Sequence, residues 1–175
     1  IFEDKTTSLE LKADHSALIM KQIWDFSQTV DIDDVKEILD RQITCNMAIA
    51  NEGIHNSYGA NIGHVILNMD SDCVKTRAKA YAAAGSDARM NGGELPVVIN
   101  SGSGNQGITC CVPVVVYAKE LDCTQEQLYR ALVLSNLTAI YIKTGIGTLS
   151  AFCGAVSAGA AAGAGIAYLH NGTYK

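Results

Sequence analysis

The feature that most constrains this fold is an uncharged run of small residues near the C-terminal end. Residues 151–169 read "AFCGAVSAGAAAGAGIAYL", 19 residues without a charged side chain. A run of this length could cross a bilayer. Alanine and glycine, however, supply little of the hydrophobicity that drives insertion. Glycines instead let neighbouring helices approach backbone to backbone. We therefore expect a buried central helix over 151–169, and no membrane partner.

Two helices before this run have clear end signals. The segment 31–54 begins with an aspartate cap at Asp31 or Asp33 and is expected to end at Gly53. The segment from 124 carries the T-x-x-Q capping box of Thr124 and Gln127. The apolar stripe expected on the first of these helices comprises Val35, Ile38, Leu39, Ile43 and Met47.

Weaker patterns predict the rest of a mostly α fold. A helix is expected from about Asp14 to residue 29, and another over 70–90 with Asp70 to Asp72 as caps. The glycines and asparagines of 51–66 indicate a loop that lines a pocket. Residues 108–118 could be a buried strand by β-branched content, but Pro113 favours a helix with this proline in its first turn. The prediction is a single helical domain over 1–175.

Charge and cysteine content narrow the class of function. The chain has 13 basic and 18 acidic residues, a net charge of −5, and no basic stripe for nucleic acid. A small-molecule ligand is therefore expected. No CxxC pair is present, so the six cysteines indicate reduced thiols of a cytoplasmic protein. They are Cys45, Cys73, Cys110, Cys111, Cys123 and Cys153.

The stretch "NSGSGNQG", residues 100–107, is the main candidate binding loop. It contains G-x-G-x-x-G but lacks the surrounding strands of a dinucleotide site, so a nicotinamide-dependent enzyme is the weakest alternative. Backbone N–H groups at a helix start suit a carboxylate. The other alternative is a polar turn between helices. The expected binding residues are Ser101, Ser103, Gly104, Asn105 and Gln106.

Two further side chains, Arg89 and Lys143, have two interpretations each. Arg89 could hold a substrate carboxylate with its planar guanidinium, or form a surface pair with Asp87. Lys143 could contact substrate or compensate a helix dipole. Cys153 would ordinarily be a small packed thiol. Adjacent Cys110 and Cys111 point about 100° apart on a helix and are expected to pack, and the four histidines lack ligand spacing.

Four motifs stand together in one order, and the chain resembles a known family through them. They are "AAAGSDARMNGG", "SGSGNQGI" followed by "PVVVYA", "RALVLSNLTAIYIKTGIGTLSAFCG" and "AGAAAGAGIAYL". From about residue 40 onward the chain resembles the α-chain domain of the iron–sulfur-dependent L-serine dehydratases. The branch that includes L-cysteine desulfidase looks most similar.

This resemblance implies α,β-elimination from a small L-amino acid, giving pyruvate and ammonia. In the family, three cysteines hold a [4Fe–4S] cluster whose open iron acts as a Lewis acid. Cys153 corresponds to the first of these ligands, and the other two would lie beyond Lys175. We therefore expect this chain to be a fragment of a longer enzyme that binds no cluster alone. The catalytic base is unassigned, and a homodimer is compatible with the family.

Two functions from different classes remain after this comparison. One is part of an iron–sulfur ammonia-lyase acting on serine or cysteine. The other is a non-catalytic amino-acid-binding domain that keeps the fold and the carboxylate-binding loop. Two closely spaced cysteines downstream of Lys175 would favour the lyase.

Overall fold

The computed structural model describes residues 16, 18–69, 71–147 and 153–174. Within these residues the chain forms seven α-helices and no strand. The helices are α1 (Met20–Thr29), α2 (Ile32–His55), α3 (Ile62–Met69), α4 (Val74–Met90), α5 (Gly104–Glu120), α6 (Gln125–Ile146) and α7 (Gly154–Leu169). The predicted mostly α single domain is confirmed.

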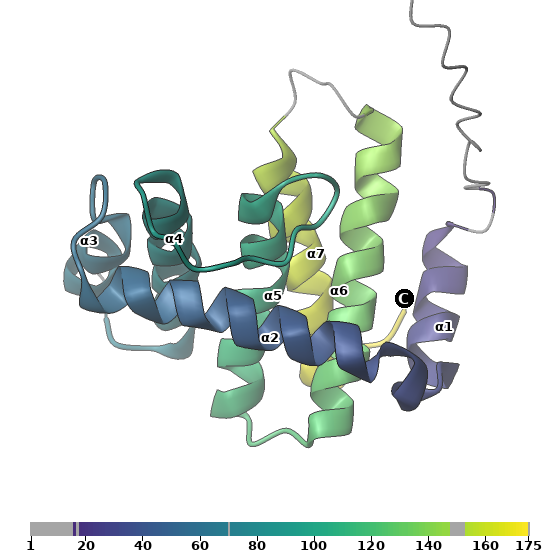
Figure 1. The fold of residues 1–175 in the computed structure, drawn as a ribbon. Helices are drawn as coiled ribbons and strands as arrows, with labels where there is room; N and C mark the ends of the chain where they lie inside the picture. Colours follow the sequence, from purple (N-terminus) through teal and green to yellow (C-terminus); the bar gives the residue numbers. More distant parts are fainter. Residues whose placement is uncertain (1–15, 17, 70, 148–152, 175) are drawn as a thin grey trace, which may run out of the picture.

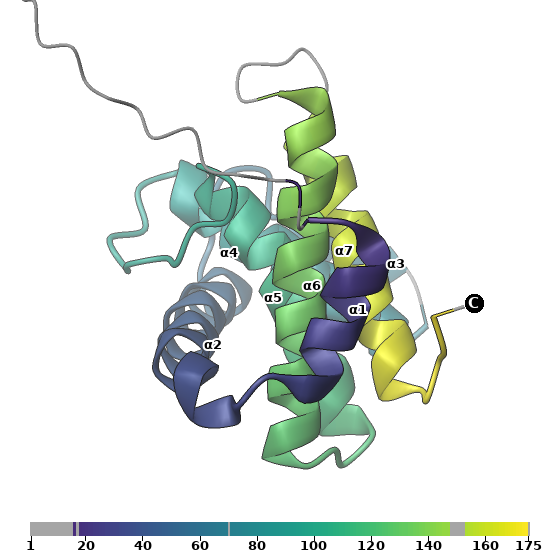
Figure 2. The same ribbon diagram turned by 90° about the vertical axis from the view of Figure 1, so that its right-hand side faces the viewer.

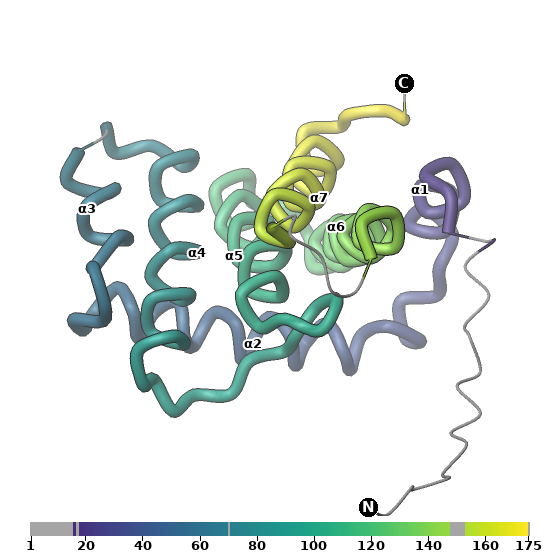
Figure 3. The backbone as a smooth tube through the Cα atoms, turned by 90° about the horizontal axis from the view of Figure 1, so that it is seen from above, coloured from purple at the N-terminus to yellow at the C-terminus, as the bar shows by residue number. Residues whose placement is uncertain are grey.

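Three helices form the centre of the molecule. Helices α5 and α7 run in the same direction and α6 runs opposite to them, so that α5 and α7 begin at the upper end in Figure 1. Helix α2 lies across this group, and Figure 3 shows α3, α4, α5, α6 and α1 following one another along its length. Figure 2 shows α1 beside α6. Helix α2 contacts α3, α4, α5 and α6, whereas α1 packs on α6 and α7 packs on α5 and α6.

The predicted start signals hold for two helices. Asp31 caps α2, since its side chain accepts from the backbone N–H of Asp33 at 3.1 Å. Thr124 and Gln127 form the predicted capping box of α6. Cys73, not an aspartate of 70–72, is the N-cap of α4. This prediction was wrong because α4 begins two residues later than the last of those aspartates.

Other predicted boundaries were also wrong. Gly53 lies inside α2, which continues to His55, because the glycine is needed for close packing against Ala84 of α4. Most of 51–66 is therefore helical, as α3 begins at Ile62. Helix α1 begins at Met20, six residues after its expected start, part of which lies outside the described residues.

Pro113 lies in the interior of α5, not in its first turn. The helix begins earlier than predicted because the glycine loop itself supplies its cap and first turn. Proline has no N–H, so the carbonyl of Thr109, four residues earlier, loses its helical donor. Both residues line a groove described below.

The small-residue run forms the predicted helix, but it is buried on one face only. The buried residues of α7 are Ser157, Ala158, Ala161, Ala162, Gly165 and Leu169, and this face packs on α5 and α6. The opposite face is exposed, and Val156 keeps 76% of its surface accessible. The expectation of a fully buried helix was therefore wrong. No helix among the described residues has the length and hydrophobicity to cross a membrane.

Two glycines of α7 provide a matched test of this arrangement. A Cβ at Gly165 would lie 2.9 Å from the Ala131 carbonyl oxygen, whereas one at Gly163 would meet nothing within 4 Å. Gly165→Ala should lower the free energy of unfolding by about 1–3 kcal/mol through overpacking. Gly163→Ala should raise it by about 0.5–1 kcal/mol. Urea unfolding followed by circular dichroism measures both, and equal effects would contradict the assigned faces.

Candidate functional site

The glycine loop makes a tight turn immediately before α5. Asn100 and Ser103 exchange two backbone hydrogen bonds of 3.0 and 3.1 Å. Between them Ser101 and Gly102 have positive φ angles of 49° and 79°. Ser103 is then the N-cap of α5 and accepts from the backbone N–H of Gln106 at 3.4 Å. The loop is thus an ordered helix start and not a linker.

The first turn of α5 presents unused donors. Within the described part of the chain, the backbone N–H groups of Gly104 and Asn105 have no acceptor. The positive end of the helix dipole adds to their attraction for an anion. This is the local chemistry that the sequence predicts for a carboxylate site.

Arg89 reaches this helix start from the last turn of α4. Its Nη1 donates to Oδ1 of Asn105 at 3.1 Å, and its side chain lies against Gly104, where any Cβ would collide with the guanidinium. The predicted alternative of an Asp87–Arg89 pair was wrong, because Asp87 accepts from the backbone N–H of Ile62 at 2.8 Å. The structure therefore brings together two motifs that lie 16 residues apart.

The start of α7 lies against the same turn of α5. A Cβ at Gly154 would collide with the side chain of Gln106, so these two residues are in direct contact. Gln106 is 8% exposed, and its Oε1 is buried without a hydrogen-bond partner in the described structure. Cys153, the N-cap of α7, is exposed. Its alternative interpretation as a packed core thiol was wrong.

Cys110 and Cys111 have the packing role predicted for them. Both are fully buried in α5. Burial raises the pKa of Cys110 to about 12 and that of Cys111 well above its ordinary value. Neither thiol is therefore available as a thiolate near neutral pH.

The remaining predicted residues are not brought into contact with the loop. Lys143 lies in the last turn of α6, and no hydrogen bond joins it to the glycine loop among the described residues. His55 and His64 bind backbone carbonyls of Asn51 and Ile54, each at 2.7 Å. The described residues contain no group of three or more histidine, cysteine or acidic side chains that could hold a metal ion.

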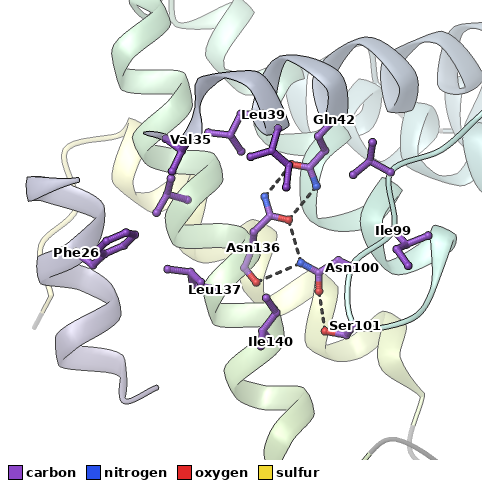
Figure 4. Close-up of a pocket in the computed structure, with 13 residues that line it drawn as sticks. Phe26, Val35, Leu39, Gln42, Ile99, Asn100, Ser101, Asn136, Leu137 and Ile140 are labelled. Atoms are coloured by element: carbon purple, nitrogen blue, oxygen red, sulfur yellow. Dashed lines mark hydrogen bonds between the residues drawn. The ribbon is translucent and has the colours of Figure 1, made fainter. Parts of the chain in front are cut away.

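A cluster of side-chain amides, which was not predicted from the sequence, holds the glycine loop in position. Gln42 of α2 and Asn136 of α6 exchange two side-chain hydrogen bonds of 2.8 and 2.9 Å. Asn100 donates to Oδ1 of Asn136 at 2.9 Å and accepts from Ser101 at 2.7 Å, as Figure 4 shows. This chain of amides connects two helices to the turn that precedes α5.

A second amide of α2 holds the strand-like segment that enters the loop. Asn46 accepts from the backbone N–H of Val98 at 2.8 Å and donates to its carbonyl at 3.1 Å. Gln42 and Asn46 are both buried, four residues apart, on the same face as Leu39. The four-residue spacing of these two amides was the sequence signal that could have predicted their shared face.

The predicted apolar stripe is confirmed for Leu39, which is buried, and for Val35, Ile43 and Met47, which pack against the core. It was wrong for Ile38, which is 62% exposed.

An apolar pocket of about 300 Å³ lies on the other side of the amide cluster. Its walls come from α1, α2, α6 and residues 98–101, and Figure 4 shows Phe26, Leu39 and Ile140 around it. The described residues that line it are all uncharged, and Gln42, Asn100, Ser101 and Asn136 are the polar ones among them. A small zwitterion is therefore better suited to the N–H groups and Arg89 at the start of α5 than to this pocket.

Comparison with known proteins gives one consistent result. A family model described as "Serine dehydratase alpha chain" matches residues 5–175. A UPF0597 protein of Desulfitobacterium hafniense is 56% identical over 171 residues, covering 98% of this chain and 40% of the relative. A UPF0597 protein of Lachnoclostridium phytofermentans is 58% identical over 159 residues, covering 91% of this chain and 38% of the relative. The chain thus spans about two fifths of these relatives, and no solved structure matches it.

The amide cluster can be tested by a nearly isosteric change. Asn136 Nδ2 donates to Gln42 and to the Leu132 carbonyl, at 2.8 and 2.9 Å, and aspartate cannot make these bonds. Asn136→Asp should lower the free energy of unfolding by about 2–4 kcal/mol, because it leaves partly buried acceptors unpaired. Urea unfolding measures this loss. Asn51→Asp, on the exposed side of α2, is the control, and a loss as small as the control's would contradict the role of the cluster.

Proposed function

Since the chain belongs to the serine dehydratase alpha-chain family, we propose that it is part of an ammonia-lyase acting on a small L-amino acid. Serine and cysteine are the candidate substrates. The observation that carries the proposal is the convergence of Arg89, the start of α5 and Cys153 at one end of the bundle. Because the relatives are longer than this chain, the activity proposed is that of the longer protein.

The substrate carboxylate would bind at the first turn of α5. The N–H groups of Gly104 and Asn105 supply donors along the positive end of the helix dipole. Arg89 adds a cation and fixes the Asn105 side chain through Oδ1, which leaves Nδ2 of Asn105 as a further donor. Ser103 holds this turn in place, while Ser101 is occupied by its bond to Asn100.

The substrate ammonium group would meet Gln106. Its buried Oε1 is an acceptor without a donor, which is costly in a folded protein unless a ligand supplies one. The Gln106 side chain lies between the first turns of α5 and α7. It contacts Gly154, the residue that follows Cys153. Carboxylate and ammonium groups of one α-amino acid would thus both be held by the first turn of α5.

Cys153 is the residue of this chain that we propose as an iron ligand. When bound, a [4Fe–4S] cluster supplies a Lewis-acidic iron that stabilises the departing hydroxyl or thiol. Its thiol is exposed at the start of α7, where a metal cluster could reach it. Cys153 is one of the ligands that such a cluster needs, and the others would come from outside the described residues.

The proposed reaction breaks two bonds and forms one. A base takes the α-proton, the β-substituent leaves with its electron pair, and a double bond forms between Cα and Cβ. The resulting aminoacrylate hydrolyses to pyruvate and ammonia. None of the residues described at the start of α5 is assigned as this base, and Lys143 remains a proposed substrate contact only.

A non-catalytic amino-acid-binding domain is the second candidate. It is supported by one observation: the unpaired N–H groups of Gly104 and Asn105 and the guanidinium of Arg89 could bind a carboxylate without a cluster. Titration calorimetry with L-serine and L-cysteine, combined with a pyruvate assay, separates the two functions. Binding without turnover in the anaerobically reconstituted longer protein would favour the binding domain.

Asn105→Ala tests the carboxylate site. In the longer protein it should lower kcat/KM by about 10–100-fold, the loss of one or two charge-assisted hydrogen bonds. Steady-state pyruvate formation from L-serine and L-cysteine measures this. Asn51→Ala, on the far part of α2, should leave the kinetics unchanged. Equal kinetics for Asn105→Ala and the unmodified protein would refute the assignment.

Cys153→Ser tests the ligand proposal through iron content as well as activity. In the anaerobically reconstituted longer protein it should abolish cluster absorbance and bound iron, and with them turnover. Cys123→Ser is the matched control, because Cys123 lies in the connection between α5 and α6. Figure 1 shows this connection at the end of the bundle opposite to the start of α7. Retention of iron by Cys153→Ser would show that another residue holds that position.

A further inference from the structure

Most helical glycines in this fold lie where a larger side chain would collide with a neighbouring segment. At Gly53, Gly63 and Gly85 an added Cβ would press on a neighbouring helix. The same is true of Gly107 against residues 98–99 and of Gly165 against α6. In each case the missing side chain allows two backbones to approach closely.

Gly159 and Gly163 of α7 differ from all of these. Nothing lies within 4 Å of a Cβ built at either position, and both residues are exposed. A glycine in a helix interior costs roughly 1 kcal/mol relative to alanine. Two of them, one turn apart on one face, lower the stability of α7 without allowing any contact among the described residues. Their spacing is that of a G-x-x-x-G helix-packing face.

These two glycines form one wall of a long groove. The groove has a volume of about 530 Å³, with α7 on one side and α3 and α4 on the other. Helix α5 provides the floor, where Pro113 lies beside Thr109. Its lining is largely apolar, with Lys75 and Lys79 at the rim. Its walls and floor are all helical, so its shape suits another helix.

We propose that this groove receives an α-helix from the part of the family's polypeptide that lies outside these 175 residues. The relatives match this chain over nearly its whole length, yet only 37–42% of their own length is covered. These relatives therefore have a large remaining segment that can supply a helix. The groove needs an occupant with small or apolar residues facing Gly159 and Gly163. This inference is independent of the proposed reaction.

The test compares this chain with the polypeptide extended to the relatives' length. Gly159→Leu and Gly163→Leu, introduced together, should leave the melting temperature of the 175-residue chain unchanged or raise it by a few degrees. In the extended polypeptide the same pair should lower it by several degrees, because leucine fills the groove. Gly145→Leu is the control, since its Cβ position in α6 is also open but lies outside the groove.

Lysine footprinting tests the same proposal on unsubstituted proteins. Lys75 at the groove rim should be acetylated more slowly in the extended polypeptide than in the shorter chain, whereas Lys36 on the exposed side of α2 should not change. Equal labelling of Lys75 in both forms would overturn the proposal. So would a 175-residue chain that dimerises in sedimentation and loses its dimer with the leucine pair, since a second copy would then be the occupant.

Discussion

The side-chain amide of Asn136 is the interaction on which the rest of the structure depends. It bonds Gln42 on α2 and Asn100 in the glycine loop, which are far apart in the sequence. Removing it would break the hydrogen bonds that join α2 and α6 at this point and those that hold the turn before α5. Because such a network is satisfied only in one arrangement, it specifies the position of the loop more sharply than apolar packing could.

This constraint explains how a glycine-rich loop can form a fixed turn. The turn from Asn100 to Ser103 is fixed by its own two backbone bonds and by the amide of Asn136. Arg89 holds the next residues, Gly104 and Asn105. Donors held before a ligand arrives need little reorganisation when it binds, which favours both affinity and catalysis. The conformational freedom that glycine offers is therefore used here to shape the turn, not to let it move.

The sequence predicted the helices well where their signals are local, as with the cap at Asp31 and the box at Thr124. It failed where distant contacts decide. Gly53 looks like a terminator, but packing against α4 keeps it inside a helix. The chemistry of the residues pointed to the loop and Arg89 as candidates. The amides of Gln42 and Asn46 were missed, because apolar periodicity does not reveal polar residues that form hydrogen bonds inside the fold.

The hydrogen bonds donated by the Asn136 amide also affect the choice of host for producing this protein. The sequence "NLT" at 136–138 is an acceptor signal for N-linked glycans. Both amide hydrogens of that asparagine are committed inside the fold, so a sugar attached there could not coexist with the amide cluster. In a eukaryotic secretory pathway, a glycan added to Asn136 before folding would prevent the amide cluster from forming. A bacterial or other non-glycosylating host is therefore the appropriate choice.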